Sequence, residues 1–319
     1  MSIEEWAKIQ TALSDAFSGG PDNVIGGEKL ARVMEEESAY GFAIVQEFKG
    51  YDVLEHSFFE FLIETLELAA QGSFRGQLPE DDKHYTILYL TFLSVFRNFR
   101  AAATLKNHGY PMRGFSLLRD LKDRAFQLGA VVNGFTNILA LRGFDPIMGK
   151  SGKLADKDSK KVRADQKTEQ STVMKLMVGT ESGLALDDIA ELEVLRDMYH
   201  EEVHGSKLSF IDDLRIVTID QRLPDFGPRP HHHNYDASMY INRACEIGWM
   251  VLRSTPYLQL EARAFGADWV EKWTLLDEAF RMQVESLAGM GKKIGPVFLR
   301  MVDAKFAFDP ETFYQSDTG

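Results

Sequence analysis

Hydrophobic residues recur every three or four positions along most of the chain, which is the spacing of an amphipathic α-helix. The most regular case lies near the C-terminus, where the apolar positions are Trp269, Trp273, Leu276, Phe280, Val284 and Leu287. We expect this stripe to face a protein core. A single segment, residues 210–219, has the pattern of a short strand. The chain is therefore predicted to be an all-α, multi-helix bundle with little or no β-sheet.

Proline and glycine mark where several of the predicted helices begin and end. Pro79 and the three acidic residues that follow it begin a long helix, which Gly109 ends. Pro111 begins the next helix. The predicted helices cover residues 4–17, 29–48, 53–70, 79–107, 111–141, 187–204, 237–254 and 268–287.

The longest apolar stretch, residues 85–99, is interrupted by polar side chains. It is also shorter than the roughly 20 residues that a membrane crossing requires, so we expect a buried helix and no membrane partner. We assign this helix to a main helical bundle, residues 76–256. An N-terminal helical extension (1–75) precedes the bundle, and a C-terminal helical extension (257–319) packs on it.

Acidic residues outnumber basic residues by 48 to 36, and the formal net charge is −12. This charge disfavours a general nucleic-acid-binding protein, which would present a basic surface. Nucleic acid is a candidate partner only through residues 150–167, where lysine is abundant and no aromatic residue is present. The single cysteine, Cys245, excludes an intrachain disulfide. We therefore predict a cytoplasmic protein and place Cys245 in the core.

Residues 200–204 read His-Glu-Glu-Val-His within a predicted helix. On a helix, His200 and His204 share one face, so both imidazoles can bind one zinc ion while Glu201 acts as the general base. A zinc hydrolase also needs a third protein ligand, and Glu246 is one of several candidates. The alternative is a structural helix with polar neighbours, since the residues after His204 do not continue a metzincin motif.

Two segments together resemble a known family. Residues 113–123 contain Leu-Leu-Arg with an acidic residue four positions after the arginine, and residues 199–206 end in Val-His-Gly-Ser. Both are similar to elements of an uncharacterised microbial helical family, catalogued as domain of unknown function number 5677. The resemblance spans roughly residues 85–255 and implies an all-helical fold without an established activity. Asp123 departs from the family, which has glutamate at this position.

The same two segments predict a polar centre. Arg119 and Asp123 are four residues apart, so they can form an ion pair on one helix face. His204 would join this pair if the two helices pack together, and its charge would then depend on its neighbours. The leading hypothesis is a ligand-binding or protein-interaction module built around this centre. Its partner would be a small molecule, another protein or a second copy of the chain.

Two enzymatic alternatives stay open. One is a zinc-dependent hydrolase that uses residues 200–204. The other is a ribonuclease or nucleotide-binding protein of the HEPN superfamily, which the chain resembles in its helical character and its arginine–histidine pair. Arg196 precedes His200 by four positions, which departs from that superfamily's R-x4-6-H spacing. The candidate catalytic residues are Arg119, Asp123, Glu201 and His204.

Overall fold

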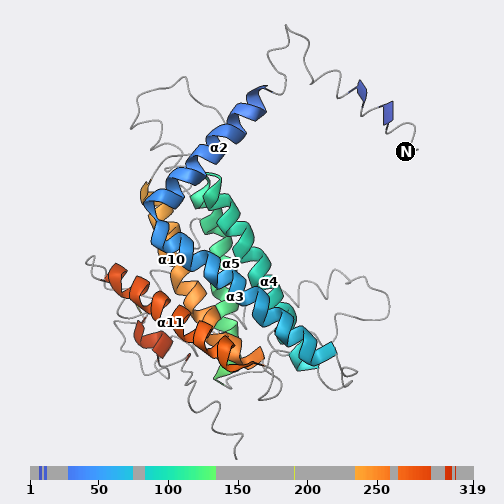
Figure 1. The fold of residues 1–319 in the computed structure, drawn as a ribbon, viewed down its shortest axis with the longest axis vertical. Coiled ribbons are helices and arrows are strands. Elements are labelled where there is room, and N and C mark those ends of the chain that lie inside the picture. Colours follow the sequence, from blue (N-terminus) through green and yellow to red (C-terminus); the bar gives the residue numbers. More distant parts are fainter. Residues whose placement is uncertain are drawn as a thin grey trace, which may run out of the picture.

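The computed structural model describes residues 7–8, 11–12, 28–74, 83–133, 190, 234–258, 265–288, 299–303 and 306. The elements are α2 (Glu28–Glu47), α3 (Lys49–Phe74), α4 (Lys83–Asn107), α5 (Pro111–Val132), α10 (Asn234–Ser254), the short 3-10 helix η3 (Thr255–Leu258) and α11 (Ala267–Ala288). The described residues contain no strand (Figure 1), which confirms the predicted all-α bundle. None of the described helices combines the length and the apolarity that a membrane crossing requires.

Five of the helices form a ring around one hydrophobic core. α4 lies on α5, α5 on α10, α10 on α11 and α11 on α3, and α3 returns to α4. α2 packs on α3 and α4, and its N-terminal part projects beyond the other described helices (Figure 1). α3 and α11 contribute to the same hydrophobic core as α4, α5 and α10, although the sequence places them in the two predicted extensions.

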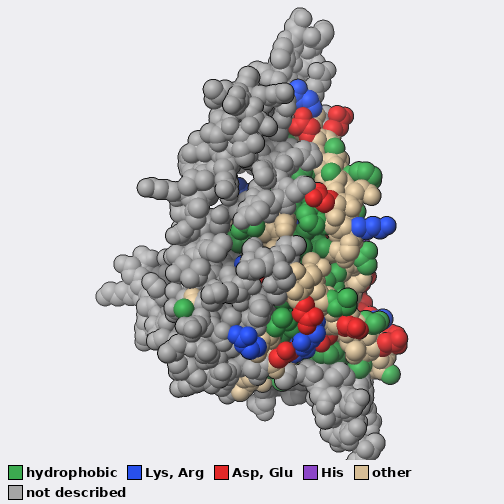
Figure 2. Space-filling model, turned by 90° about the vertical axis from the view of Figure 1, so that its left-hand side faces the viewer, with side chains coloured by type: hydrophobic (Ala, Val, Ile, Leu, Met, Phe, Trp, Pro, Cys, Tyr) green, Lys and Arg blue, Asp and Glu red, His purple; other side chains and the backbone are tan. Residues whose placement is uncertain are grey.

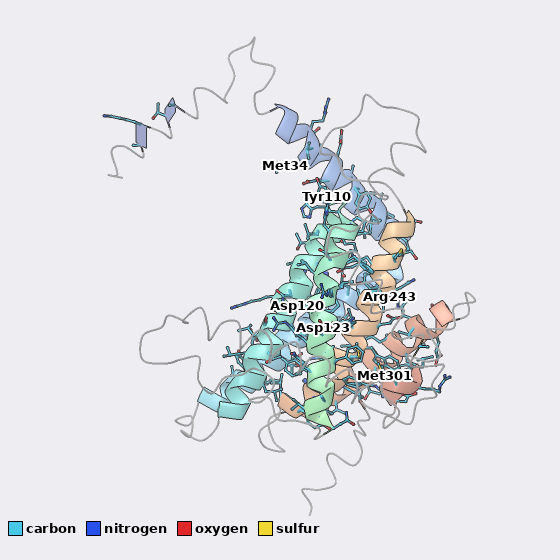
Figure 3. All side chains as sticks on the ribbon, turned by 180° about the vertical axis from the view of Figure 1, so that it is seen from behind. Met34, Tyr110, Asp120, Asp123, Arg243 and Met301 are labelled. Atoms are coloured by element: carbon cyan, nitrogen blue, oxygen red, sulfur yellow. The ribbon has the colours of Figure 1, made fainter. Side chains whose placement is uncertain are left out.

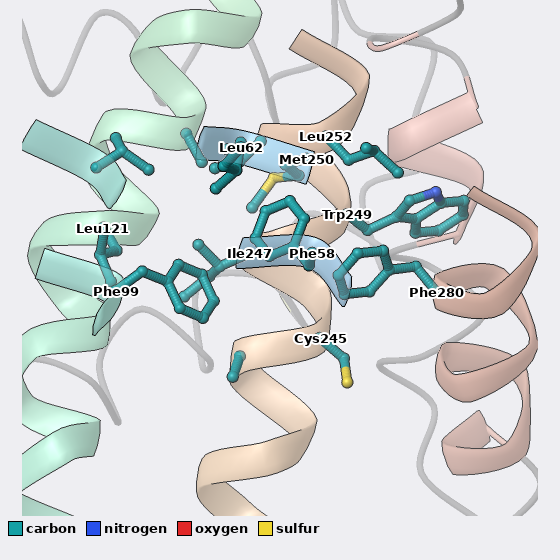
Figure 4. Close-up of a cluster of buried hydrophobic side chains, with 14 of the residues drawn as sticks. Phe58, Leu62, Phe99, Leu121, Cys245, Ile247, Trp249, Met250, Leu252 and Phe280 are labelled. Carbon is teal, nitrogen blue, oxygen red and sulfur yellow. The ribbon is translucent and has the colours of Figure 1, made fainter. Parts of the chain in front are cut away.

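Phe58 of α3 occupies the centre of the core (Figure 4). Its ring meets Phe99 of α4 at a centroid distance of 5.8 Å and Phe280 of α11 at 5.2 Å, both edge to face. Such pairs contribute about 0.5–1.5 kcal/mol beyond simple burial. The predicted α11 stripe is buried from Trp269 to Val284, and Cys245 lies in the core as expected. Helical periodicity therefore identified the buried face of α11 correctly.

The turn between α4 and α5 forms as its glycine predicts. Gly109 has a φ of 88°, a left-handed conformation that side chains with a Cβ rarely adopt. The Gly109 N–H donates to the Lys106 carbonyl at 3.1 Å, and the Tyr110 N–H donates to the Leu105 carbonyl at 2.8 Å. This is the Schellman pattern, which satisfies the last carbonyls of a helix. Pro111 then begins α5 without losing a hydrogen bond.

α5 ends at Val132, so the predicted extension to residue 141 is wrong. At this end the Asn133 backbone N–H makes the last i→i−4 hydrogen bond of the helix, to the Gly129 carbonyl at 3.0 Å, and the Asn133 side-chain amide donates to the same oxygen at 2.7 Å. Asparagine is disfavoured within helices and common at their ends, because its side chain hydrogen-bonds to nearby backbone groups. The apolar periodicity continues beyond this point in the sequence, so periodicity alone does not mark the end of α5.

An ionic network fixes α11 against α10. Asp277 of α11 accepts hydrogen bonds from Trp249 Nε1 at 2.6 Å and from Arg253 Nε and Nη2 at 2.7 and 3.0 Å. Arg253 also reaches Asp303, which Arg281 binds as well. A two-pronged arginine–carboxylate contact is directional, so it sets the rotation of α11 about its own axis. That rotation determines which α11 residues face α3.

Candidate functional site

The predicted polar centre is only partly within the described structure. His200, Glu201 and His204 lie outside the described residues, so the zinc motif and the convergence of His204 with α5 stay predictions. Arg119 and Asp123 lie on α5, where both are partly buried. Asp123 Oδ1 is 3.8 Å from Lys122 Nζ. The pairing of Arg119 with Asp123 also stays a prediction.

A neighbouring acidic residue on α5 makes the contacts that link this face to α4. Asp120 Oδ2 accepts from Arg124 Nε at 2.7 Å, an ion pair across one helical turn. The same oxygen accepts from Asn98 Nδ2 of α4 at 3.1 Å. Figure 3 shows Asp120 and Asp123 close together along α5. Because Asp120 is exposed, its ion pair with Arg124 contributes under about 1 kcal/mol, and the hydrogen bond from Asn98 is the contact that links α4 to α5.

Glu246 was a candidate third zinc ligand, and the structure places it in an ion pair. Arg243 Nη1 donates to both of its carboxylate oxygens, at 2.7 and 2.6 Å, and both residues are buried on α10. The carboxylate is thus already neutralised by its own helix. Among the described residues, no group of three or more His, Cys, Asp or Glu side chains is placed to hold a metal ion.

A charged cluster that sequence reasoning missed lies inside the bundle. Lys106 Nζ of α4 is 2.8 Å from Glu55 Oε2 of α3, and the two side chains are only 1% and 5% exposed. The hydroxyl of Tyr51, one turn before Glu55, donates to Glu55 Oε1 at 2.7 Å. The ammonium also lies 4.8 Å above the Tyr51 ring and 5.9 Å from the Tyr240 ring. We call Tyr51, Glu55, Lys106 and Tyr240 the buried cluster.

The neutral members of this region stay neutral at physiological pH. Burial raises the pKa of the Tyr51 and Tyr240 hydroxyls well above their usual value, and the charge of Glu55 raises both further. Burial also raises the pKa of the nearby Cys245 thiol, so this cysteine is protonated and a poor nucleophile. The buried cluster thus consists of one ion pair, Lys106 with Glu55, surrounded by protonated tyrosine side chains. Its chemistry fits the joining of α3 to α4 rather than catalysis.

The opposite side of α3 borders an open groove of about 1090 Å³, whose other wall is α11. We call it the α3–α11 groove. Its apolar lining includes three exposed side chains, namely Val53 (59%), Ile63 (37%) and Leu275 (61%). Apolar side chains exposed together on one concave surface are typical of a binding site.

Acidic side chains surround these apolar positions. Asp52, Glu60, Glu64 and Glu67 all line the groove, against a single lysine, Lys272. Lys272 Nζ is 2.7 Å from Asp268 and 2.9 Å from Glu64, and these hydrogen bonds raise the pKa of the lysine. Lys272 is therefore already paired. Within the described part of the chain, Asp52, Glu60 and Glu67 have no cationic partner.

The groove combines exposed hydrophobic side chains with uncompensated negative charge. Figure 2 shows hydrophobic and acidic side chains intermixed over the described part of one face of the molecule. The sequence contained a signal for this site, because α3 is apolar on most sides and its core-facing stripe accounts for only some of those residues. The remaining apolar residues had to face another helix or the solvent.

Comparison with family models, with curated proteins and with solved structures gives no match for this chain. The resemblance to the uncharacterised helical family and to HEPN proteins therefore stays a prediction.

Proposed function

We propose that this protein is an interaction module that binds a cationic, apolar segment of a partner protein in the α3–α11 groove. The observation that supports this function is the coincidence of exposed apolar side chains with unpaired carboxylates on one concave surface. The proposal keeps the predicted class of ligand-binding or protein-interaction protein. The proposed site is the groove between α3 and α11 instead of the polar centre on α5.

The apolar side chains of the groove favour a partner with aliphatic groups. Val53, Ile63 and Leu275 are exposed, and burial of apolar surface contributes roughly 25 cal/mol for each Å². All three project from long helices rather than from loops. A rigid scaffold loses little conformational entropy on binding, so more of the contact energy appears as affinity.

The walls of the groove are held together beneath its surface. Trp269 Nε1 of α11 donates to Thr65 Oγ1 of α3 at 2.8 Å, and the Thr65 hydroxyl donates to the Phe61 carbonyl at 2.7 Å. The rings of Phe61 and Trp269 are 5.1 Å apart. These contacts are buried, so they fix the spacing of α3 and α11 before a partner arrives.

The charge of the groove selects the sign of the partner. Asp52, Glu60 and Glu67 together produce a negative potential that attracts lysine or arginine side chains and accelerates their association. The same potential repels nucleic-acid backbones and anionic lipid surfaces. The ribonuclease and zinc-hydrolase hypotheses depend on residues 196–204, outside the described structure, and nothing in the groove favours either of them.

A fluorescence-anisotropy titration tests the proposed function. The probe is a labelled 18-residue peptide of leucine, alanine and lysine with an apolar and a cationic face. We expect saturable binding to the wild-type protein, and we expect the double variant Glu60→Lys/Glu67→Lys to bind at least roughly tenfold more weakly, the equivalent of about 1.4 kcal/mol.

A matched control separates local charge from net charge. Glu35→Lys/Glu47→Lys adds the same charge at exposed positions of α2, neither of which lines the groove. We expect this control to bind like the wild type. Equal weakening in both double variants would show that the peptide responds to overall charge, and the proposed site would be wrong.

A further inference from the structure

We infer that the partner segment is an α-helix that lies along α3 and carries cationic side chains about two helical turns apart. This inference rests on the proposed function and specifies the partner of the same groove. Its basis is the placement of the unpaired carboxylates relative to the exposed apolar side chains on α3.

The carboxylates are spaced at a helical repeat. Asp52, Glu60 and Glu67 follow one another at intervals of eight and seven residues. At a rise of 1.5 Å per residue these intervals correspond to roughly 12 and 10 Å along α3. Seven or eight residues make about two turns, so all three carboxylates lie on one side of the helix.

The exposed apolar residues share that side. At about 100° per residue, Val53 and Ile63 fall within the same third of the circumference of α3 as the three carboxylates. Val53 lies beside Asp52, and Ile63 lies between Glu60 and Glu67 in the sequence. Acidic and apolar positions are therefore interspersed on this surface, with His56 between Val53 and Glu60, and this suits a partner helix that carries both cationic and apolar side chains.

The length and the walls of the groove also suit a helix. The α3 lining runs from Gly50 to Glu67, roughly 25 Å at the helical rise, which is the length of a partner helix of about 17 residues. Leu275 and Ala279, one turn apart on α11, form the opposite wall. A small side chain at Ala279 beside a large one at Leu275 leaves a hollow that admits an aliphatic side chain of a neighbouring helix.

An extended peptide fits this surface less well. Extended segments usually gain affinity by pairing their backbone with the edge of a β-sheet. The described residues contain no strand, and the backbone groups of α3 and α11 are used within their own helices. A helical partner satisfies its own backbone hydrogen bonds and needs only side-chain contacts from the groove.

Three isomeric peptides of identical composition test this inference. The first has leucines at helical spacing and lysines seven and eight residues apart. The second alternates leucine and lysine with a period of two, and the third has the same residues in scrambled order. We expect the first to bind the wild-type protein at least roughly tenfold more tightly than the others, with a gain of helical circular dichroism on binding. Glu60→Lys/Glu67→Lys should abolish this preference, and Glu35→Lys/Glu47→Lys should retain it.

The outcomes separate this inference from the proposed function. Equal binding of all three peptides, lost in Glu60→Lys/Glu67→Lys, would overturn the helical partner and leave the binding module in place. No binding of any peptide would overturn both. Spermine that displaces the first peptide at an equal concentration would overturn the helical partner in favour of a polyamine. A dimer of the wild type that Glu60→Lys/Glu67→Lys dissociates, seen by analytical ultracentrifugation, would identify a second copy as the occupant and overturn a separate partner.

Discussion

Carboxylates on the two sides of α3 lie in opposite environments. One side faces the buried cluster, and the other side borders the α3–α11 groove. Glu55 is buried, paired with Lys106 and hydrogen-bonded to Tyr51, whereas Glu60 and Glu67, within the next four turns, are exposed and unpaired. A buried charge is destabilising unless a partner neutralises it, so the inner carboxylate is committed to structure. An exposed carboxylate stays hydrated and can bind a cation from another molecule. Similar side chains on one helix thus serve the fold on one side and recognition on the other.

We expect the largest change in the free energy of unfolding from substitutions on the buried side of α3. Lys106→Met leaves Glu55 unpaired in the interior, and we expect the free energy of unfolding to fall by about 3–5 kcal/mol. Glu55→Leu/Lys106→Met removes both charges, and we expect it to recover most of that loss. Urea unfolding measures both values, with Glu67→Gln as a surface control that changes stability by under about 0.5 kcal/mol. A loss below about 1 kcal/mol in Lys106→Met would remove the distinction between the two sides.

Two glycines, one beside the buried cluster and one beside the α3–α11 groove, provide a second contrast. A Cβ at Gly114 would lie 2.7 Å from the Ala102 carbonyl oxygen and 3.0 Å from the Tyr240 ring of the buried cluster. We expect Gly114→Ala to lower the free energy of unfolding by about 1–3 kcal/mol through overpacking. Gly50 borders the α3–α11 groove, and no atom lies within 4 Å of a Cβ built there. Gly50→Ala should leave stability unchanged or raise it by up to about 1 kcal/mol, since alanine favours the helix. Thermal unfolding that ranks the two variants in the reverse order would contradict this packing.

The pH dependence of stability should also come from buried groups, in and beside the buried cluster. Because burial raises the folded-state pKa of Cys245, Tyr51 and Tyr240, their stabilising contribution is complete below the pKa of the unfolded chain and is lost as pH rises above it. We expect stability to fall above about pH 9, by at most about 1.4 kcal/mol per pH unit for each group. Urea midpoints between pH 8 and 10.5 measure this slope. Cys245→Ala should have a shallower slope, and an identical slope would show that the thiol does not take part.

The smallest effect on stability is expected on the groove side. Leu275 is 61% exposed, so Leu275→Ser should change the free energy of unfolding by under about 0.5 kcal/mol. It should nevertheless weaken binding of the helical peptide, because the leucine contributes apolar area only in the complex. A paired measurement by urea unfolding and anisotropy checks both statements. A variant that loses stability and binding together would place Leu275 in the core rather than in the recognition surface.

Several elements were predictable from the sequence because their signals are local. The turn at Gly109 and Pro111 follows from backbone conformations that only these residues adopt readily. The buried stripe from Trp269 to Val284 follows from helical periodicity. The end of α5 was predicted wrongly, because the apolar pattern continues past Asn133, the residue at which the helix ends.

The candidate site was harder to predict because its parts are distant in the chain. Glu55 and Lys106 are 51 residues apart, and each alone has the sequence pattern of a solvated charge. The two walls of the groove, α3 and α11, are also far apart in the chain. The hydrogen bond between Trp269 and Thr65, which holds the walls together, joins residues more than 200 positions apart. The sequence pattern shows that α3 has apolar residues on most sides, but it does not predict which of these residues a neighbouring helix covers.

The sequence by itself determined that the described part of this protein is helical, the bounds of α2 and α11 to within one residue, and which side of α11 is buried, since these properties depend on interactions within a few residues. Only the tertiary structure decided which charges of α3 are paired inside the bundle and which remain available in the α3–α11 groove. The physical reason is that burial depends on which helices pack together, and packing is a property of the whole chain.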